Sequence, residues 1–223
     1  MNNVKKKISY LTQTEQNLLL GCLLGDGHIE KRGNSYRLKI RHCEQQSEYV
    51  TWKYKILKRI CHKQPKIIQN GKNGAYSASY FNSKSGLYLK QYHDLFYKLV
   101  IDNTGNKSYY KKNISPQLID FLSNDPLILA VWYMDDGHCR TDCLGAKLAT
   151  DCFSKEEVVL LQSYLKFNFS LKTNIFFASK MRSQYGLSIL AKNNNFANFV
   201  HLIKPIVTEV PCMKYKIKRP RND

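Results

Sequence analysis

Leu19-Leu20-Gly21-Cys22-Leu23-Leu24-Gly25-Asp26-Gly27 is the stretch that decides the fold, because the chain repeats its pattern as Leu129-Ala130-Val131-Trp132-Tyr133-Met134-Asp135-Asp136-Gly137. Each stretch is an apolar run that ends in a carboxylate and a glycine, and a histidine follows both copies. A charge at the tip of a buried helix costs free energy unless a partner offsets it. Because the chain has such a charged helix end twice, we infer that the two ends serve one purpose.

The residues before each stretch are typical of helix starts. Thr12 and Glu15 have the spacing of a capping box, in which each side chain binds the backbone amide of the other residue. Asp125-Pro126 combines an N-cap with proline at the first helical position. We therefore expect helices over residues 12–25 and 125–135.

The intervals after each Asp-Gly pair match as well. The distance from Asp26 to Lys112 is 86 residues, and the distance from Asp136 to Lys216 is 80 residues. Such matched intervals indicate an internal duplication. We expect an α+β fold in which an αββαββα unit occurs twice about a pseudo-twofold axis. The motif helices would pack at the interface, and two antiparallel, saddle-shaped sheets would form a groove.

The patterning between these points predicts the remaining elements. Strict alternation of apolar and polar residues predicts strands, and apolar residues three or four positions apart predict helices. The expected strands are 35–43, 66–68, 75–81, 137–140, 147–152, 173–179 and 185–190. The expected helices are 45–61, 87–101, 154–167 and 195–206. A turn signal at residues 71–74 joins two of the strands into a hairpin.

A polar, lysine-containing stretch after residue 102 separates the two halves. Stretches rich in glycine and polar residues between patterned segments are typical of loops and linkers. We expect half-domains at residues 1–104 and 125–223, joined by a linker at residues 105–124.

The composition favours a nucleic-acid partner. The 223 residues include 35 Lys and Arg against 17 Asp and Glu, which gives a formal charge of +18, while 43% of the residues are hydrophobic. A folded chain with this excess repels itself, and a polyanion relieves the repulsion. We find no apolar run that could span a membrane and no signal-like start, so we expect an intracellular protein without a membrane partner. The bias toward Lys, Asn and Tyr suggests an organellar genome.

The cysteines indicate reduced thiols. There are seven, an odd number, and most lie in apolar or strand-like segments. Cys139, Cys143 and Cys152 lack the spacing of a zinc signature. We therefore expect no structural zinc.

Packing of the two motif helices along their apolar faces would bring Asp26 and Asp136 into one small space. Carboxylates so close repel each other, and the negative ends of two helix dipoles add to the repulsion. A divalent cation resolves this conflict, and oxygen ligands suit Mg²⁺, with Mn²⁺ as a substitute. A metal held there activates water and stabilises a leaving oxygen in phosphodiester hydrolysis. Lys112 and Lys216 would offset charge at the phosphorus or help to position the attacking water.

Basic side chains on the expected strands indicate that the groove formed by the two saddle-shaped sheets is a DNA-binding groove. A β-ribbon fits the major groove of DNA, where Arg and Lys read guanine edges. The residues expected to bind DNA are Arg37, Lys39, Arg41, Arg140, Lys147, Lys180 and Arg182. Alternating basic residues are also common on solvated strand faces, so this assignment depends on the other evidence for a nucleic-acid partner.

The two quoted stretches resemble the motifs of the LAGLIDADG homing endonucleases, specifically the monomeric, two-motif kind. Leu202-Ile203-Lys204-Pro205 and Met213-Lys214-Tyr215-Lys216 resemble the C-terminal segment of such monomers, so the likeness covers nearly the whole chain. The resemblance implies a monomer that cuts both strands of a long, specific DNA site across the minor groove and leaves short 3′ overhangs.

The resemblance also implies roles for particular residues. The catalytic acids and metal ligands would be Asp26 and Asp136, with the backbone carbonyls of Gly25 and Asp135 as further metal contacts. The basic residues near the cut phosphates would be Lys112 and Lys216, a choice over neighbouring lysines that depends on the resemblance alone.

Other interpretations of the same residues stay open. An Asp-Gly pair after a helix is, by itself, ordinary turn chemistry. The same scaffold could serve as a maturase that binds structured intron RNA without cutting it, and this is the alternative function. A DNA-binding regulator that kept only the fold would have no metal-dependent activity.

Overall fold

A computed structural model describes residues 10–70, 76–102, 105 and 107–217. The expected hairpin turn at residues 71–74 and the end of the basic tail lie outside these residues. Among the helices of the described part, none is long and apolar enough to cross a membrane.

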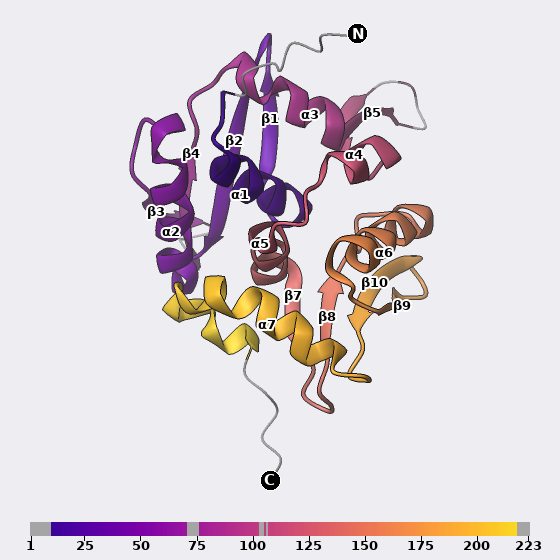
Figure 1. The fold of residues 1–223 in the computed structure, drawn as a ribbon. Helices are drawn as coiled ribbons and strands as arrows, with labels where there is room; N and C mark the ends of the chain where they lie inside the picture. The colour runs from indigo at the N-terminus through magenta and orange to yellow at the C-terminus, as the bar shows by residue number, and fades with distance from the viewer. Residues whose placement is uncertain (1–9, 71–75, 103–104, 106, 218–223) are drawn as a thin grey trace, which may run out of the picture.

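The described chain consists of two similar halves and a connection between them (Figure 1). The first half contains α1 Gln13–Leu24, β1 His28–Arg32, β2 Ser35–Cys43, η1 Glu44–Gln46, α2 Ser47–Leu57, η2 Lys58–Ile60, β3 Lys66–Asn70, β4 Tyr76–Asn82, η4 Leu87–Leu89 and α3 Lys90–Phe96. The second half contains α5 Pro126–Asp136, β7 Gly137–Cys139, β8 Ala146–Ala149, α6 Lys155–Phe169, β9 Thr173–Ser179, β10 Gln184–Ile189, α7 Asn195–Thr208 and η5 Pro211–Ile217. The connection contains β5 Tyr97–Ile101, β6 Ser108–Lys112 and α4 Pro116–Phe121.

Each half contains one four-stranded antiparallel sheet, and the strand orders are equivalent. The orders are β1-β2-β4-β3 and β7-β8-β10-β9. In β2 the residues alternate between a buried face and an exposed face, as the sequence predicts. The predicted α+β class and the duplicated αββαββα unit are therefore confirmed.

Local sequence signals fix the starts of the main helices. Thr12 and Glu15 form the predicted capping box at α1, and Ser154 and Glu157 form another at α6. The Asp125 side chain accepts a hydrogen bond from the Leu127 amide at 2.8 Å and so caps α5. These caps set where each helix begins and, through its length, where its C-terminal end lies.

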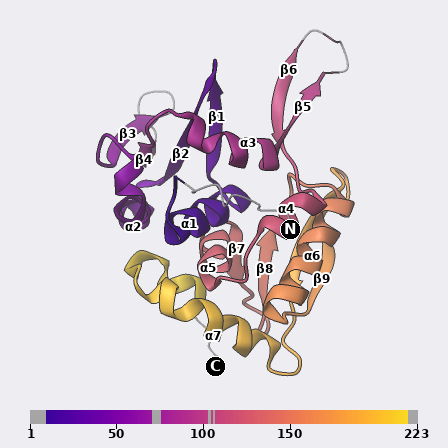
Figure 2. The same ribbon diagram turned by 45° about the horizontal axis from the view of Figure 1, so that its top comes forward.

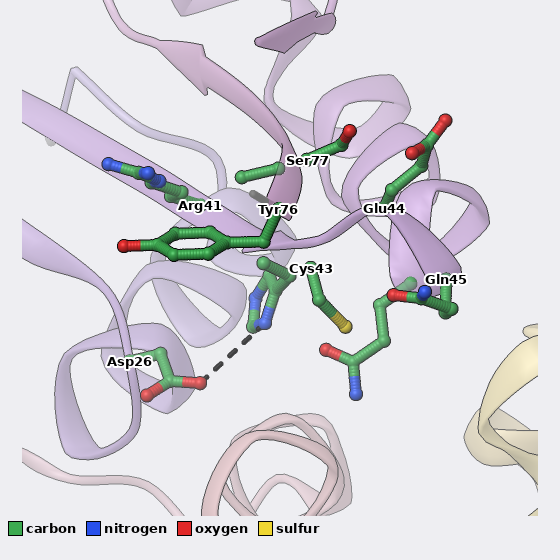
Figure 3. Close-up of a pocket in the computed structure, with 10 residues that line it drawn as sticks. Asp26, Arg41, Cys43, Glu44, Gln45, Tyr76 and Ser77 are labelled. Carbon is green, nitrogen blue, oxygen red and sulfur yellow. Dashed lines mark ion pairs between the residues drawn. The ribbon is translucent and has the colours of Figure 1, made fainter. Parts of the chain in front are cut away.

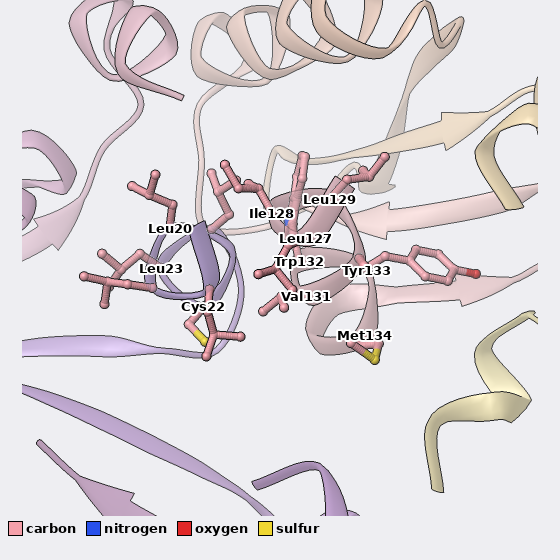
Figure 4. Packing of buried hydrophobic residues seen from close by; sticks show 14 of the residues in the cluster. Leu20, Cys22, Leu23, Leu127, Ile128, Leu129, Val131, Trp132, Tyr133 and Met134 are labelled. Carbon is pink, nitrogen blue, oxygen red and sulfur yellow. The ribbon is translucent and has the colours of Figure 1, made fainter. Parts of the chain in front are cut away.

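The two motif helices, α1 and α5, form the centre of the core (Figure 4). Their apolar residues are buried, with Leu20, Leu23 and Trp132 each 0% exposed. Gly21 allows the close contact, because a Cβ atom there would lie 2.7 Å from the Cβ atom of Val131. The predicted packing of the motif helices at the interface is confirmed.

The expected helix over residues 87–101 is wrong beyond Phe96. Tyr97–Ile101 forms β5, which pairs with β6 in antiparallel register. The stretch read as a linker thus contains a strand and the short helix α4. Tyr97, Val100 and Ile101 are residues with high strand propensity, and pairing with β6, which begins 7 residues after Ile101, outweighs their helical spacing.

Candidate active site at the ends of the two motif helices

The C-terminal ends of α1 and α5 meet at one place. The Asp26 amide, just past α1, donates a hydrogen bond to Oδ2 of Asp135, near the end of α5, at 3.1 Å. The Asp26 side chain is 49% exposed, and Asp136 is half-buried. The two acids expected from the sequence therefore belong to one site at the surface.

The electrostatics of the site favour a bound cation. Burial and the nearby Asp26 and Asp135 raise the pKa of Asp136 to about 7, although Lys112 and Lys216 oppose the shift. Burial and Asp135 also raise the pKa of Asp26. A proton or a metal ion that reduces the repulsion between such acids stabilises the site.

Two lysines reach the motif ends, one from the end of β6 and one from η5. The ammonium group of Lys112 donates to the Gly25 carbonyl at 2.5 Å, and that of Lys216 donates to the Gly137 carbonyl at 2.6 Å. Burial lowers the pKa of both lysines against the pull of the nearby acids. The neighbouring Lys111 and Lys214 are exposed instead, so it is Lys112 and Lys216 that the fold directs to the motif ends.

The side chain of Asp135 is fully buried and anchors the junction between the halves. Its Oδ1 accepts from the ammonium group of Lys53 at 2.7 Å and from the Tyr49 hydroxyl at 2.8 Å. Gly25 leaves room for this carboxylate, because a Cβ atom at position 25 would lie 2.5 Å from the Asp135 Cβ atom. The Asp135 side chain is 0% exposed although the residue is partly exposed, so its backbone is the part that faces solvent.

Asp26, His42 and Asp135 also lie close enough to hold a metal between them. Lys53 occupies that space, because its ammonium group is 2.7 Å from Asp135 Oδ1 and 3.0 Å from the Nε2 atom of His42. Burial and Lys53 lower the pKa of His42 to about 4, so the ring is neutral at pH 7. A second cation there would be repelled by the ammonium group, which leaves the space between Asp26 and Asp136 as the better metal site.

The donor set at Asp26 and Asp136 fits a hard divalent cation. Two carboxylates and the solvent-facing backbone of Asp135 supply oxygen ligands of the kind that Mg²⁺ and Mn²⁺ prefer. The Gly25 carbonyl already accepts a hydrogen bond from Lys112, so it would have only its second lone pair for a metal.

Lys53, Tyr49 and His42 lie beside Asp135 and Asp26 and are not among the site residues expected from the sequence. A signal was present, since Lys53 follows Tyr49 by four residues and so lies on the apolar face of α2. Likewise, His42 alternates with the buried residues of β2. Charged or polar residues at buried positions require a partner, and this requirement points to a buried network.

A cavity of about 810 Å³ opens beside Asp26 (Figure 3). Arg41 and Tyr76 lie on its sheet side, and Gln45 lies in η1, just before α2. All of these side chains are polar, and the first sheet provides most of the wall. The cavity therefore joins the acidic site to the exposed face of the sheet.

The residues expected to bind DNA lie partly on the sheets and partly beside them. Arg37, Lys39 and Arg41 lie on β2 and Lys147 lies on β8, whereas Arg140 follows β7, and Lys180 and Arg182 lie in the turn between β9 and β10. Arg37 donates to Glu30 at 2.7 Å, and Arg140 donates to Asp142 at 2.5 Å. The ammonium group of Lys147 lies 4.9 Å from the centroid of the Phe176 ring. The exposed members of the set are Lys39, Arg41, Lys180 and Arg182.

The cysteines agree with the expectation of reduced thiols. All seven are free. Cys139 donates a hydrogen bond to the Lys216 carbonyl at 2.9 Å, and Tyr133 donates to the same carbonyl at 2.8 Å. These two contacts hold the segment that carries Lys216.

The sequence of the chain is similar to those of known DNA endonucleases and maturases. The model of the LAGLIDADG DNA endonuclease family matches residues 16–199. The DNA endonuclease I-ChuI of Chlamydomonas applanata is 26% identical over 216 residues, which cover 93% of this chain and 95% of I-ChuI. The cytochrome b mRNA maturase bI2 of Debaryomyces hansenii is 30% identical over 208 residues, which cover 90% of this chain and 72% of the maturase.

A solved structure gives the same fold. The homing endonuclease I-WcaI bound to its DNA recognition sequence superimposes with a TM-score of 0.76 at 23% sequence identity, over 95% of this chain and 88% of I-WcaI. Some other relatives are longer, and the chain spans about half of their length.

Two equivalent acidic helix ends in a duplicated α+β fold define a DNA-cleaving enzyme with both motifs in one chain. The chain belongs to the LAGLIDADG DNA endonuclease family, and within it to the DNA homing endonucleases.

Proposed function

We propose that this endonuclease acts as a monomer on one long, specific site in duplex DNA, cuts both strands and leaves short 3′ overhangs. The observation that carries the proposal is the meeting of the two acidic motif ends, where the Asp26 amide binds the Asp135 carboxylate at 3.1 Å. Because α1 and α5 pair within one chain, one copy contains both acids.

Asp26 and Asp136 would hold the divalent metal, with the backbone carbonyls of the preceding residues, Gly25 and Asp135, as further contacts. When bound, the metal supplies an activated water and stabilises the leaving oxygen. Mg²⁺ with Mn²⁺ as a substitute is supported by the oxygen donor set. It is also supported by I-DmoI, whose similar fold has a TM-score of 0.51 and which was crystallised with DNA and Mn.

The chain's own cations would act on the phosphate. Lys112 and Lys216 are held at the motif ends by carbonyl groups 2.5 and 2.6 Å away. Their ammonium groups would offset the negative charge that develops at phosphorus. Because Lys112 binds at the end of α1 and Lys216 at the end of α5, each would serve one of the two strands.

The basic residues of the two sheets would bind the duplex on either side of the acids. Those proposed are Arg37, Lys39, Arg41, Arg140, Lys147, Lys180 and Arg182. Arg37 and Arg140 hold carboxylates, so they would exchange an internal partner for a base or phosphate. Lys39 lies 3.7 Å from Glu30 and would share in that exchange, whereas the exposed Arg41 would bind without it.

Cleavage of a library of duplex sites tests the proposal. We expect cutting with Mg²⁺ or Mn²⁺, and binding without cutting with Ca²⁺. Asp26→Asn and Asp136→Asn remove several kcal/mol of transition-state stabilisation, which is about a thousandfold or more in rate, while target binding persists. Asp120→Asn, at an exposed acid of α4, is the matched control and should cut as the wild type does. Failure to cut any duplex contradicts the proposal, and normal cutting by both motif variants would show that the acids are wrongly assigned.

A maturase is the second candidate, because the protein from Debaryomyces hansenii that is 30% identical is a cytochrome b mRNA maturase. The test compares affinity for the cleaved duplex with affinity for structured intron RNA at one salt concentration, since salt alone changes both strongly. Tighter binding to the RNA would favour the maturase, and tighter binding to the duplex would favour the endonuclease.

A further inference from the structure

The β5–β6 hairpin starts and ends at the active site. Its last residue, Lys112, donates to the Gly25 carbonyl at 2.5 Å. At its first residue, the Tyr97 hydroxyl oxygen accepts from the Ile29 amide at 2.9 Å and lies 3.2 Å from the Nδ1 atom of His28. Figure 2 shows the hairpin lengthwise, extending beyond the end of α3. Anything bound along the hairpin is therefore next to the substrate.

The face of the hairpin that carries Lys112 continues outward as an exposed apolar surface. Tyr97 pairs with Lys112, and Leu99 pairs with Tyr110, so these four residues share one face. Leu99 is 55% exposed, and Ile101, two residues further along this face, is 62% exposed. Apolar side chains that alternate on an exposed strand and lead away from a catalytic lysine need a partner to cover them.

The net positive charge of the hairpin favours a negatively charged partner. Residues 97–112 contain four lysines and one aspartate. Lys98 and Lys111 pair across the two strands, and both are exposed. Lys98 also lies 3.9 Å from Glu157, a distance too long for a hydrogen bond. Both lysines lie on the face of the ribbon opposite Leu99 and Ile101, together with Tyr109, which is 53% exposed. Lysine and tyrosine side chains are among those that contact the sugar-phosphate backbone in protein–DNA complexes, so this second face suits a phosphate chain.

The hairpin is held upright before any partner binds. The ammonium group of Lys31, on β1, donates to the Tyr110 hydroxyl at 3.1 Å. The ring of His93, on α3, meets the Tyr110 ring edge-on at a centroid distance of 4.6 Å. A ribbon fixed by two elements of the first half loses less conformational entropy on binding than a free loop does.

We propose that the β5–β6 hairpin is a third DNA-binding ribbon, separate from the two sheets, which holds the backbone of the duplex beside the phosphate that the first motif serves. The ribbon lies in a groove of the duplex, where Lys98 and Lys111 contact phosphates from one face and Leu99 and Ile101 cover sugars from the other. The proposal rests on the proposed DNA cleavage, since that reaction brings a duplex to Lys112.

Binding of the cleaved duplex in Ca²⁺ by fluorescence anisotropy tests the ribbon. The double variant Lys98→Ala/Lys111→Ala should raise Kd about tenfold or more and reduce the salt slope by about 2, because two phosphate contacts are lost. Lys155→Ala/Lys166→Ala removes the same charge from exposed positions of α6 and should change Kd less than twofold. Unchanged thermal unfolding temperatures show that both variants are folded.

A crosslink locates the ribbon on the DNA independently of affinity. A photo-crosslinking benzoylphenylalanine at position 99 should attach to the duplex within a few base pairs of one cut, whereas the same group at the exposed position 159 of α6 should not. Equal Kd values and salt slopes for the two double variants, without a crosslink at position 99, overturn the proposal. So does a loss of affinity confined to structured RNA. If instead the wild type cuts no duplex, it is the proposed function that fails.

Discussion

The ion pair between Lys53 and Asp135 is the residue-scale feature that fixes the site. Both side chains are 0% exposed, and their charged atoms are 2.7 Å apart. Burial opposes the charge on Lys53, but Asp135 outweighs burial and raises the pKa of the lysine. In return, Lys53 and His42 lower the pKa of Asp135 against its burial. The pair joins α2 of the first half to the motif helix of the second.

Removing one member of this pair should be costly. Asp135→Asn leaves Lys53 charged and buried without a counter-ion, and such changes cost about 3–5 kcal/mol of unfolding free energy. Lys53→Met/Asp135→Asn removes both charges and should cost less than the two single changes together. Chemical denaturation of the four proteins measures the coupling. Additive costs would mean that the buried charges do not stabilise each other.

Metal binding should depend on the proton that Asp136 holds. Its pKa is raised to about 7 from an ordinary value of 3.8. A raised pKa in the folded state means that metal-free stability from this group is full below about pH 4 and is lost as pH rises toward 7. The metal-free protein thus favours the protonated form of Asp136, whereas a metal favours the charged form, to which it binds.

Apparent affinity for Mn²⁺ should therefore rise about tenfold per pH unit up to pH 7 and level off above it. Calorimetric titration between pH 5 and pH 8.5 measures this dependence. Asp136→Asn should bind weakly at every pH. The same slope in that variant would assign the proton to another group.

At the scale of elements, the contact between α1 and α5 depends on a glycine. A Cβ atom at Gly21 would lie 2.7 Å from the Val131 Cβ atom and 2.9 Å from the Ile128 carbonyl oxygen. Gly21→Ala must therefore push the two helices apart, which we expect to cost about 1–3 kcal/mol of unfolding free energy and to slow cleavage. Thr14→Ala, at an exposed position of α1, is the control for both measurements. Wild-type stability and cleavage in Gly21→Ala would mean that the helices tolerate a wider spacing.

The helices and strands that could be predicted correctly are those stabilised by residues close to them in the sequence. Thr12 and Glu15 cap α1 from within four residues, so the helix start could be read directly. Tyr97 begins a strand because β6 pairs with it and because its hydroxyl binds Ile29, and neither cause lies near it in the sequence. The third helix was predicted too long for this reason.

The same division holds in the site. Asp26 and Asp136 could be found from the repeated motif, since the repeat marks equivalent positions. Lys53 could not be assigned a role, because its partner, Asp135, is 82 residues away. The choice of Lys112 over Lys111 depends on strand alternation in β6, which was read as part of a linker.

At the scale of the molecule, the duplication is symmetric in topology and asymmetric in how the halves are joined. Figure 1 shows α7 crossing below α5 toward α2. The Trp52 indole donates to Glu209 at 3.0 Å, and the Cys212 amide donates to Glu48 at 3.1 Å. The C-terminal segment thus binds to α2 of the first half through two hydrogen bonds. The same segment places Lys216 at the end of α5 in the second half. A domain motion that separated the halves would have to break these contacts and the Lys53–Asp135 pair.

The charge of the whole chain predicts how strongly salt weakens DNA binding. The formal charge is +18, but Arg37 and Arg140 hold carboxylates and should release few counterions. Of the residues proposed to bind DNA, those left on or beside the sheets are Lys39, Arg41, Lys147, Lys180 and Arg182, and the hairpin adds the exposed Lys98, Lys107 and Lys111. Eight phosphate contacts give a slope of log affinity against log salt of about −7, or roughly a 10⁴-fold loss between 50 and 200 mM salt.

Anisotropy titrations at four salt concentrations measure this slope. Lys155→Ala/Lys166→Ala should leave it unchanged, since α6 lies away from the exposed sheet faces. Arg41→Ala should reduce the slope by about 1, because one phosphate contact is lost. A slope shallower than about −3 would mean that most of these residues do not touch phosphates. The positive charge would then serve solubility, and base contacts would have to carry the affinity.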